Sequence, residues 1–299
     1  MGCKGSEVRI LSLRFLVFSD STVLAKMCKQ LFQKKYQQHT SHMDQLICQW
    51  VEDQHSAAVS FSSVCAFALE GGRMVRSFLL DHIAQSIRPD FSSDRDLFLL
   101  SIELAHAASL VADDLPFMDH ADTRRGKPSV HALFGKDKAM LCCYHLFCSA
   151  FELLSSARVM EKESIIRAVS CLAKVGKELV GGQWMDLCRG REGTLKKEDI
   201  EIWLSKKTGS LFGTAFVLGW LLGGGDEGLL EKVEEMGVRF GVLFQIRDDF
   251  YDREEDIGNN VYAYLSEREI FEKREHHQAV LSRWAQHSLI PQEPFEMFL

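Results

Sequence analysis

The stretch DLFLLSIELAHAASLVADD, residues 96–114, is apolar over most of its length and ends in two aspartates. A helix that is apolar nearly all round is expected inside a bundle rather than on its surface. Helix-breaking residues are scarce around it, since only Pro116 and Pro128 occur between residues 90 and 290. Because no sustained alternation of apolar and polar residues accompanies this scarcity, the sequence predicts an all-α protein.

Two further segments carry apolar residues at a spacing near 3.6, residues 164–182 and residues 231–250. The run Gly223-Gly224-Gly225 predicts a turn between helices. It does not fit a phosphate-binding loop, because no strand precedes it and no GK[ST] follows. We therefore expect one all-helical domain over residues 43–299, preceded by a basic extension over residues 1–42 that is partly disordered or helical.

The extension holds seven Lys and Arg against Glu7 and Asp20. The apolar ILSLRFLVF around Arg14 suggests a targeting leader, and MGCKGS fits the loose pattern for N-myristoylation beside Cys3. We favour a variable extension, or an early start codon ahead of Met43, over either signal. No run reaches the roughly 18 uncharged apolar residues that indicate a membrane-spanning helix.

The composition excludes some classes of function. A net charge of -7 argues against nonspecific nucleic-acid binding, which needs a basic surface. The nine cysteines include no CxxC pair, and several lie in apolar stretches: Cys65, Cys142, Cys143, Cys148 and Cys171. Reduced core cysteines in a cytoplasmic protein are favoured over a disulfide framework.

The sequence DDFYD, residues 248–252, places Asp248 and Asp252 on one face of a helix, with Asp249 beside them. Clustered like charges destabilise a helix unless a cation offsets them, and Mg²⁺ prefers carboxylate oxygens. A solvated acidic helix end is the alternative. The apolar GVRFGVLFQI that precedes the cluster favours the metal site, because such a stretch is expected to be buried.

A second acidic cluster, DDLPFMD, holds Asp113, Asp114 and Asp119, again where an apolar helix ends. Pro116 is expected to open the helix before Asp119 turns back. If the two clusters face each other across a cavity, they can hold several metal ions. Arg124 and Arg125 follow closely, and adjacent arginines suit bidentate recognition of phosphate.

Several stretches, in the same order and spacing, resemble the trans-isoprenyl diphosphate synthases, which include the farnesyl and geranylgeranyl diphosphate synthases. They are EGGRMVR, ELAHAASLVADDLPFMDHADTRRGKPSVHALFG, GGQWMD, KKTGSLF and FGVLFQIRDDFYD. The resemblance covers roughly residues 43–265, and the four residues between Asp114 and Asp119 resemble the bacterial and plastid branch. It implies a bundle of long helices around a deep central cavity, with both acidic motifs at its mouth.

The resemblance also implies a role for each matching residue. Three Mg²⁺ ions, bridging the allylic diphosphate, would be held by Asp113, Asp114, Asp119, Asp248, Asp249 and Asp252. Isopentenyl diphosphate would contact Arg73, Arg76, His106 and Arg125. The allylic diphosphate would contact Arg124, and the leaving diphosphate and the carbocation would be held by Lys207, Thr208 and Gln245. Taken alone, His106 reads as a satisfied core histidine.

The implied reaction is the head-to-tail (1'-4) condensation of isopentenyl diphosphate with dimethylallyl, geranyl or farnesyl diphosphate. The allylic C–O bond would ionise in a water-poor cavity while cations neutralise the departing diphosphate. Such a mechanism needs no protein nucleophile, which agrees with the lack of a convincing Ser/His/Asp or Cys/His arrangement in the sequence. The resemblance further implies a homodimer.

Product length is expected to depend on the helix below the first acidic cluster. In the family that the sequence resembles, a bulky aromatic residue five positions before the first aspartate limits the product to C15. Here that position is Ala108, followed by Ser109. At about 1.5 Å per residue, Ala108 lies roughly a turn and a half below Asp113. The small side chain predicts a product longer than farnesyl diphosphate, with geranylgeranyl diphosphate favoured.

The sequence departs from the family pattern at three places. Met74 and Ser77 stand where the pattern GGKRLRP has a cation and a proline, and Cys142-Cys143-Tyr144 replaces AGD. Asn259 and Asn260 stand where glycine and the lysine of a basic lid are expected. These departures leave two alternatives, a noncatalytic regulatory subunit and a terpene cyclase. Two complete acidic motifs argue against the former, and Arg73, Arg76, His106 and Arg125 argue against the latter.

Overall fold

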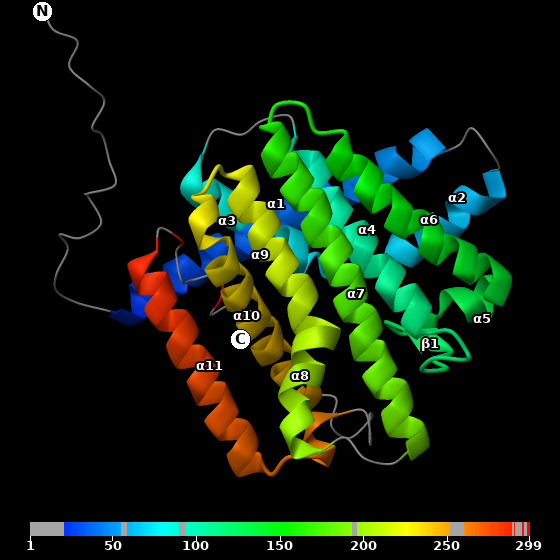
Figure 1. Ribbon diagram of the computed structural model, residues 1–299. Helices are drawn as coiled ribbons and strands as arrows, with labels where there is room; N and C mark the ends of the chain where they lie inside the picture. The colour runs from blue at the N-terminus through cyan, green and yellow to red at the C-terminus, as the bar shows by residue number, and fades with distance from the viewer. Residues whose placement is uncertain are drawn as a thin grey trace, which may run out of the picture.

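A computed structural model describes residues 21–54, 59–89, 94–192, 196–251, 260–288, 290, 295 and 298–299. This part of the chain is a bundle of helices with one very short hairpin (Figure 1). The helices are α1 Ser21–Asp53, α2 Val59–Leu69, α3 Val75–Ile87, α4 Arg95–Asp113, α5 Val130–Phe134, α6 Lys136–Ser155, α7 Lys162–Glu192, α8 Ile200–Leu204, α9 Ser210–Leu222, α10 Leu230–Tyr251 and α11 Glu267–His287. No helix of the described residues is long and apolar enough to span a membrane.

Helix α4 lies inside the bundle and packs along α6 on one side and α3 on the other. It buries residues on all sides, among them Phe98, Leu99, Ile102 and Leu104, each without exposed surface. The expectation that residues 96–114 form an internal helix is therefore confirmed. The Gly223–Gly225 turn is confirmed as well, since α9 ends at Leu222 and α10 begins at Leu230.

Helices α9 and α10 approach each other closely through four glycines. A Cβ atom added at Gly241 would lie 2.7 Å from the Cα atom of Gly209, and one added at Gly237 would lie 2.7 Å from the Cα atom of Gly213. Real Cβ atoms do not approach this closely, so only glycine permits the packing. The close approach brings the residues before α9 into hydrogen-bond reach of α10.

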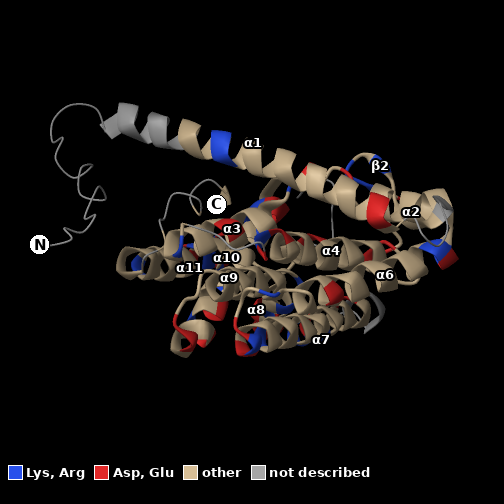
Figure 2. Ribbon diagram, turned by 90° about the horizontal axis from the view of Figure 1, so that it is seen from above, with Lys and Arg blue, Asp and Glu red and all other residues tan. Residues whose placement is uncertain are grey.

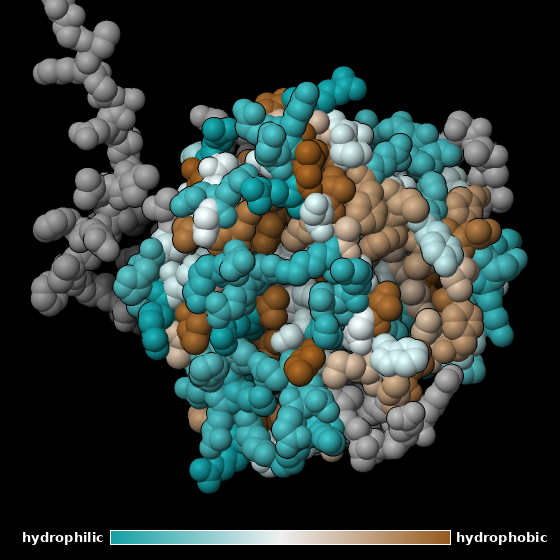
Figure 3. All heavy atoms as spheres, in the orientation of Figure 1, coloured by the Kyte–Doolittle hydropathy of each residue, from teal (hydrophilic) through white to brown (hydrophobic). Residues whose placement is uncertain are grey.

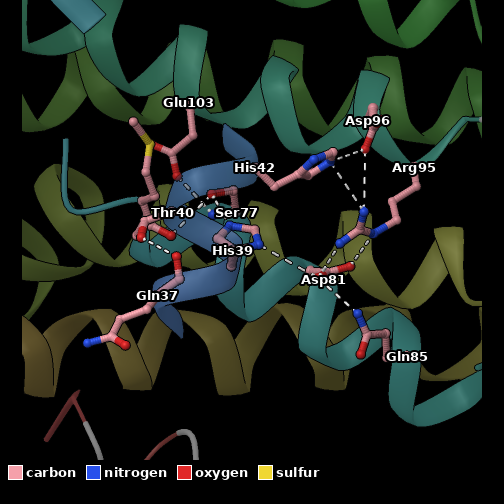
Figure 4. A network of polar contacts seen from close by, with 11 residues as sticks. Gln37, His39, Thr40, His42, Ser77, Asp81, Gln85, Arg95, Asp96 and Glu103 are labelled. Atoms are coloured by element: carbon pink, nitrogen blue, oxygen red, sulfur yellow. Dashed lines mark hydrogen bonds and ion pairs between the residues drawn. The ribbon is translucent and has the colours of Figure 1, made fainter. Parts of the chain in front are cut away.

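Helix α1 lies across α3 and α4 (Figure 2). It runs without a break through residue 43, at which we expected the domain to begin. Its buried His39 contacts Ser77 and Asp81 of α3, with His39 Nε2 2.9 Å from Ser77 Oγ (Figure 4). Arg95 of α4 donates two hydrogen bonds to the same Asp81, at 2.7 and 2.8 Å. This network fastens three helices together.

A hairpin of two-residue strands, β1 Thr123–Arg124 and β2 Lys127–Pro128, follows the first acidic cluster. It was not predicted from the sequence. Arg125 and Gly126 connect the strands with φ angles of 54° and 73°. Positive φ at both central residues is typical of a tight type I′ hairpin turn, and glycine at the second position favours it. The turn sends the side chains of Arg124 and Arg125 to different partners.

The cysteines of the described residues differ in burial. Cys65 of α2 and Cys142 of α6 are buried in the core, and their sulfur atoms lie 3.9 Å apart. Cys143 and Cys171 are partly buried, whereas Cys148 is exposed on α6. The expectation of a core position is therefore wrong for Cys148.

Candidate active site

One cavity of about 730 Å³ collects most of the residues that the sequence singled out. It lies where the C-terminal ends of α4 and α10 meet the residues before α3 and α9. The predicted residues that line it are Arg73, Arg76, His106, Ser109, Asp113, Asp119, Arg124, Arg125, Lys207, Thr208, Gln245, Asp248 and Asp249. Segments far apart in the sequence therefore converge on one space, as both acidic clusters and the arginines were expected to do.

The first acidic cluster opens as Pro116 predicts. Helix α4 ends at Asp113, and the chain then turns so that the Asp119 N–H donates to the Asp113 carbonyl at 2.9 Å. Asp113 and Asp119 line the cavity. Asp114 is buried instead, and its carboxylate accepts hydrogen bonds from Arg124. Asp114 therefore holds Arg124 at the wall rather than presenting its own oxygens to the cavity.

The cavity wall at Asp113 is electrostatically unusual. Burial, the largest cause, and the nearby Asp119 and Asp186 carboxylates raise the pKa of Asp113 to about 7, although Lys207 and Arg124 oppose the shift. A carboxylate in this state lacks a sufficient counter-cation. Such a group is a candidate ligand for a cation that arrives from solution.

Lys207 is placed by a π-helical turn, Ser205–Gly209, between α8 and α9. Such turns are rare and frequently mark functional sites. The Lys207 ammonium pairs with Asp186 of α7 and lies 3.7 Å from Asp119. Burial alone would lower the pKa of Lys207, but the carboxylates of Asp186, Asp119 and Asp113 raise it. The ammonium is therefore held charged beside the first acidic cluster.

In the second acidic cluster, Asp248 and Asp249 have different surroundings. Asp248 faces the cavity and pairs with Arg73, whose Nη2 lies 2.6 Å from Asp248 Oδ2. Asp249 is buried and accepts hydrogen bonds from Gln245 Nε2 at 2.6 Å and from the Val261 N–H at 2.8 Å. Asp252, the third predicted metal ligand of this cluster, lies outside the described residues, as does Asn259 of the expected lid.

Thr208 and Gln245 form a polar pair opposite the first cluster. Thr208 Oγ1 donates to Gln245 Oε1 at 2.7 Å, and Gln245 then donates to Asp249. The glycine contacts between α9 and α10 make this reach possible. The chain Thr208, Gln245, Asp249 fixes the orientation of the Gln245 amide, so its oxygen and nitrogen are each already committed.

The wall formed by α3 and α4 is rich in guanidinium groups. Arg76 donates to His106 Nε2 at 3.0 Å, and burial, followed by the charge of Arg76, lowers the pKa of His106 well below its ordinary value. His106 is therefore neutral. Burial also lowers the pKa of Arg76 to about 10. Arg73 and Arg125 lie near the same groups and leave this wall strongly positive.

The arginine-bearing segment is held in place by residues from other helices. Met74 has a φ of 50°, which non-glycine residues adopt only with strain. Glu103 of α4 accepts a hydrogen bond from the Ser77 N–H at 2.9 Å and so caps the start of α3. Tyr36 of α1 donates to the Arg73 carbonyl. The loss of proline at position 77 is thus offset by contacts from α1 and α4.

Ala108 and Ser109, the two positions expected to set product length, differ in whether they reach the cavity. Ser109 lines the cavity, and its hydroxyl donates to the His106 carbonyl. Ala108 is 1% exposed and is packed within the core rather than among the described residues that line the cavity. A larger side chain at Ala108 would have to displace neighbouring core atoms, whereas one at Ser109 would take up space in the cavity.

Several cavity residues were not identified from the sequence as functional. Tyr36, Glu103 and Phe244 line the cavity, whereas Gln183 and Asp186 stand behind it and bond to its Asp119 and Lys207. Glu103, Gln183 and Asp186 lie inside stretches that carry the family resemblance, so the resemblance could have indicated them. Tyr36 precedes those stretches and has no local pattern, so only the packing of α1 reveals it.

The donor set fits magnesium. Carboxylate oxygens from opposite walls, Asp113 and Asp119 on one side and Asp248 on the other, face a shared space. Among the described residues, no three His, Cys, Asp or Glu side chains are close enough to form a metal site alone. Mg²⁺ commonly binds through one or two carboxylates together with substrate phosphates and water. The arrangement therefore suits metal ions that arrive with a phosphorylated ligand.

Several plant proteins with similar sequences are named geranylgeranyl pyrophosphate synthases. "Putative geranylgeranyl pyrophosphate synthase 8, chloroplastic" of Arabidopsis thaliana is 38% identical over 190 residues, which cover 62% of this chain and 52% of the relative. "Geranylgeranyl pyrophosphate synthase 4" of the same plant is 43% identical over 156 residues, which cover 51% of this chain and 42% of the relative. The chain thus spans about half the length of the curated relatives it matches.

Solved structures show the same fold. A geranyltranstransferase from Thermotoga maritima has a TM-score of 0.75 and 24% identity, covering 88% of this chain and 95% of its own. An FPP/GFPP synthase from Zymomonas mobilis has a TM-score of 0.77 and 23% identity, covering 91% and 96%. The model of the polyprenyl synthetase family matches residues 60–263, which include both acidic clusters as far as Asp252. The chain therefore belongs to the polyprenyl synthetase family.

Proposed function

We propose that this protein is a trans-prenyl diphosphate synthase that condenses isopentenyl diphosphate with an allylic diphosphate. One observation carries the proposal: carboxylates from α4 and α10 and five arginines line a single cavity of about 730 Å³. Carboxylates suit metal ions, and guanidinium groups suit phosphates. The names of the curated relatives support the same reaction.

In this proposal the two walls bind different substrates. Arg73, Arg76 and Arg125 bind the diphosphate of isopentenyl diphosphate beside the neutral His106. Arg124 and Lys207 bind the allylic diphosphate, and Asp113, Asp119 and Asp248 hold Mg²⁺, with Asp114, Asp249 and Asp252 as the remaining carboxylates of the two motifs. The magnesium ions, when bound, supply positive charge to the leaving diphosphate.

The protein groups then stabilise charge as it moves. Lys207 is held charged by Asp186, so it can bind oxygens of the departing diphosphate without a change in its own protonation. Thr208 and Gln245 present fixed dipoles to the carbocation. Preorganised groups of this kind need little rearrangement as the reaction proceeds. The double bond of isopentenyl diphosphate attacks the cation, and a proton leaves to the released diphosphate.

The favoured product is geranylgeranyl diphosphate. Ala108 and Ser109 are the small residues below Asp113, and no aromatic ring stands at either position. A growing chain that runs along α4 meets less obstruction there than it would with a bulky residue. The names of the plant relatives point in the same direction.

We further propose a homodimer that pairs through α6 and α7. Apolar side chains on these helices are strongly exposed: Leu141 59%, Tyr144 64%, Val180 71% and Trp184 68%. Figure 3 shows brown and tan residues gathered over this side of the molecule. Grouped exposed apolar residues commonly mark protein interfaces. Sedimentation of the protein with and without Tyr144→Glu and Val180→Glu tests this interface.

A cytoplasmic location remains a prediction from the cysteines.

The decisive experiment is incubation of the purified protein with Mg²⁺, isopentenyl diphosphate and each allylic primer, followed by mass analysis of the products. We expect elongation from at least one primer and a C20 diphosphate as the main product. No elongation with any primer would favour a noncatalytic partner. A cyclic hydrocarbon formed from an allylic diphosphate alone would favour a terpene cyclase. Asp113→Asn provides the inactive control.

A further inference from the structure

We infer that Arg247 is an additional diphosphate-binding residue, on the cavity wall assigned above to isopentenyl diphosphate. The inference rests on the proposed function and extends it to a residue that neither acidic motif includes. Arg247 lies on α10 directly before Asp248, is partly buried, and lines the cavity.

The position of Arg247 on α10 determines which side of the cavity its side chain faces. On a helix, Phe244 and Tyr251 lie three residues before and four residues after Arg247, so they share its face. Gln245 and Asp249, which bond to each other and to Thr208, lie two residues away on either side and point elsewhere. Arg247 therefore faces away from the side of the cavity on which Lys207 and Thr208 stand.

Arg73, which we assign to isopentenyl diphosphate, lies on the same wall of the cavity as Arg247. Its guanidinium lies 4.8 Å from the centre of the Phe244 ring and pairs with Asp248 at 2.6 Å. Arg73 thus contacts residues on both sides of Arg247 in the sequence. Two guanidinium groups that approach one space from α10 and from the segment before α3 form a site for a polyanion, because a diphosphate accepts several charge-assisted hydrogen bonds.

Arg247 differs from the other cations of the cavity in its partners. Arg73, Arg124 and Lys207 each pair with a carboxylate of the protein. Within the described residues, Arg247 has no ion pair or hydrogen bond, and its guanidinium lies 5.8 Å from the centre of the Tyr251 ring. A partly buried guanidinium is most stable when a counter-ion approaches it. Its charge is available to a ligand without the rupture of an ion pair to another described residue.

Arg247 can replace positive charge that this sequence lacks at two positions of the family pattern. Met74 replaces a cation of the family pattern and is 4% exposed. Asn260 replaces the expected lid lysine, and its amide is used to bind the Asp249 carbonyl at 2.6 Å and the Tyr262 N–H at 2.9 Å. Neither position can supply positive charge. Arg247, Met74 and Asn260 line the same cavity, so Arg247 can offset both losses.

The test measures binding of isopentenyl diphosphate by isothermal titration calorimetry, without Mg²⁺ and with no allylic substrate, for the wild type, Arg247→Gln and Arg247→Lys. Arg268→Gln is the matched control, because Arg268 is on α11, highly exposed, and paired only with Glu272 in the described part of the chain. We expect the Kd to rise about tenfold in Arg247→Gln, to recover largely in Arg247→Lys, and to stay unchanged in the control. The KM for the allylic primer and kcat should change less than twofold.

Two results would overturn the inference alone. One is a wild-type Kd in Arg247→Gln. The other is an equal loss of affinity for both substrates together with a lower melting temperature, which would assign Arg247 a structural role. A wild-type protein that neither binds isopentenyl diphosphate nor elongates any primer would instead overturn the proposed function, and this inference with it.

Discussion

Arg73 Nη2 and Asp248 Oδ2 lie 2.6 Å apart, although 175 residues separate them in the chain. The residue proposed to bind isopentenyl diphosphate therefore neutralises a carboxylate proposed to bind Mg²⁺. Arg73 is 63% exposed and Asp248 27% exposed, so the pair contributes about 1 kcal/mol or less to folding. It is weak enough to open when both ligands arrive.

Arg73→Gln is expected to separate these two roles. Without the competing guanidinium, Asp248 should bind Mg²⁺ more tightly in the presence of inorganic pyrophosphate, by up to about fivefold. The same substitution should weaken isopentenyl diphosphate by about tenfold or more. Calorimetric titration with each ligand checks both. A fall in Mg²⁺ affinity would show that Arg73 supports the metal site instead of competing with it.

Asp113→Asn is expected to stabilise the metal-free protein while it abolishes elongation. The folded-state pKa of about 7 lies above the ordinary 3.8, so the ionised carboxylate destabilises the fold at neutral pH. Because this side chain keeps partial contact with solvent, we expect a gain on the order of 1–2 kcal/mol. Urea unfolding in EDTA measures it. Asp137→Asn, on the exposed first turn of α6, is the control, and a destabilised Asp113→Asn would contradict the argument.

The sequence was sufficient for the helices that carry the acidic clusters. The apolar run before Asp113 and the run before Asp248 predict buried helices, and the structure confirms both as α4 and α10. The arginine pair after the first cluster was also recognised, because a phosphate site needs that chemistry at that spacing. These features are local, so local patterns reveal them.

Other parts of the site depend on contacts between distant segments. The π-helical turn that carries Lys207 is favoured by packing against α7, where Gly182 leaves room for the Lys207 backbone. The partner of Lys207, Asp186, lies in another helix. Glu103 caps α3 from α4, and no spacing in either helix predicts this. Tertiary contacts of this kind require the fold itself.

Substitutions below Asp113 should shorten the product. Ser109→Phe places a ring directly at the cavity wall, and Ala108→Tyr places one in the packing beside it. We expect C15 in place of C20 as the main product, with the larger change in Ser109→Phe. Mass analysis of products from dimethylallyl and geranyl diphosphate measures this. If Ala108→Tyr leaves the distribution unchanged, the chain-length argument from that position is wrong.

Tyr36→Phe should weaken isopentenyl diphosphate without altering the chemical step. The hydroxyl supports the backbone of Arg73, while the ring packs on Phe78 and Phe298 with centroids 5.2 Å away in each case. Loss of one hydrogen bond corresponds to about 1 kcal/mol, so the KM for isopentenyl diphosphate should rise about fivefold. The value of kcat should stay within twofold. Tyr144→Phe is the control, because it keeps the ring of the proposed dimer surface on α6 and lies outside the cavity lining. A fall in kcat alone would assign Tyr36 another role.

Asp81→Asn should destabilise the protein in a manner that depends on pH. The Asp81 side chain is 8% exposed. Burial alone would raise its pKa, but hydrogen bonds from Arg95 and His39 lower it to about 2. A folded-state pKa below the ordinary 3.8 means that the carboxylate stabilises the fold above pH 3.8. The contribution of about 2 kcal/mol is lost as the pH falls toward 2.

The difference in unfolding free energy between wild type and Asp81→Asn should therefore be smaller at pH 3 than at pH 7. Urea unfolding followed by circular dichroism at both pH values measures it. Asp96→Asn provides a comparison in the same network, because the Asp96 side chain is 43% exposed and pairs with His42. We expect a change below about 1 kcal/mol in that variant. A difference for Asp81→Asn that stays constant with pH would mean that packing around Asp81, rather than its charge, holds α1, α3 and α4 together.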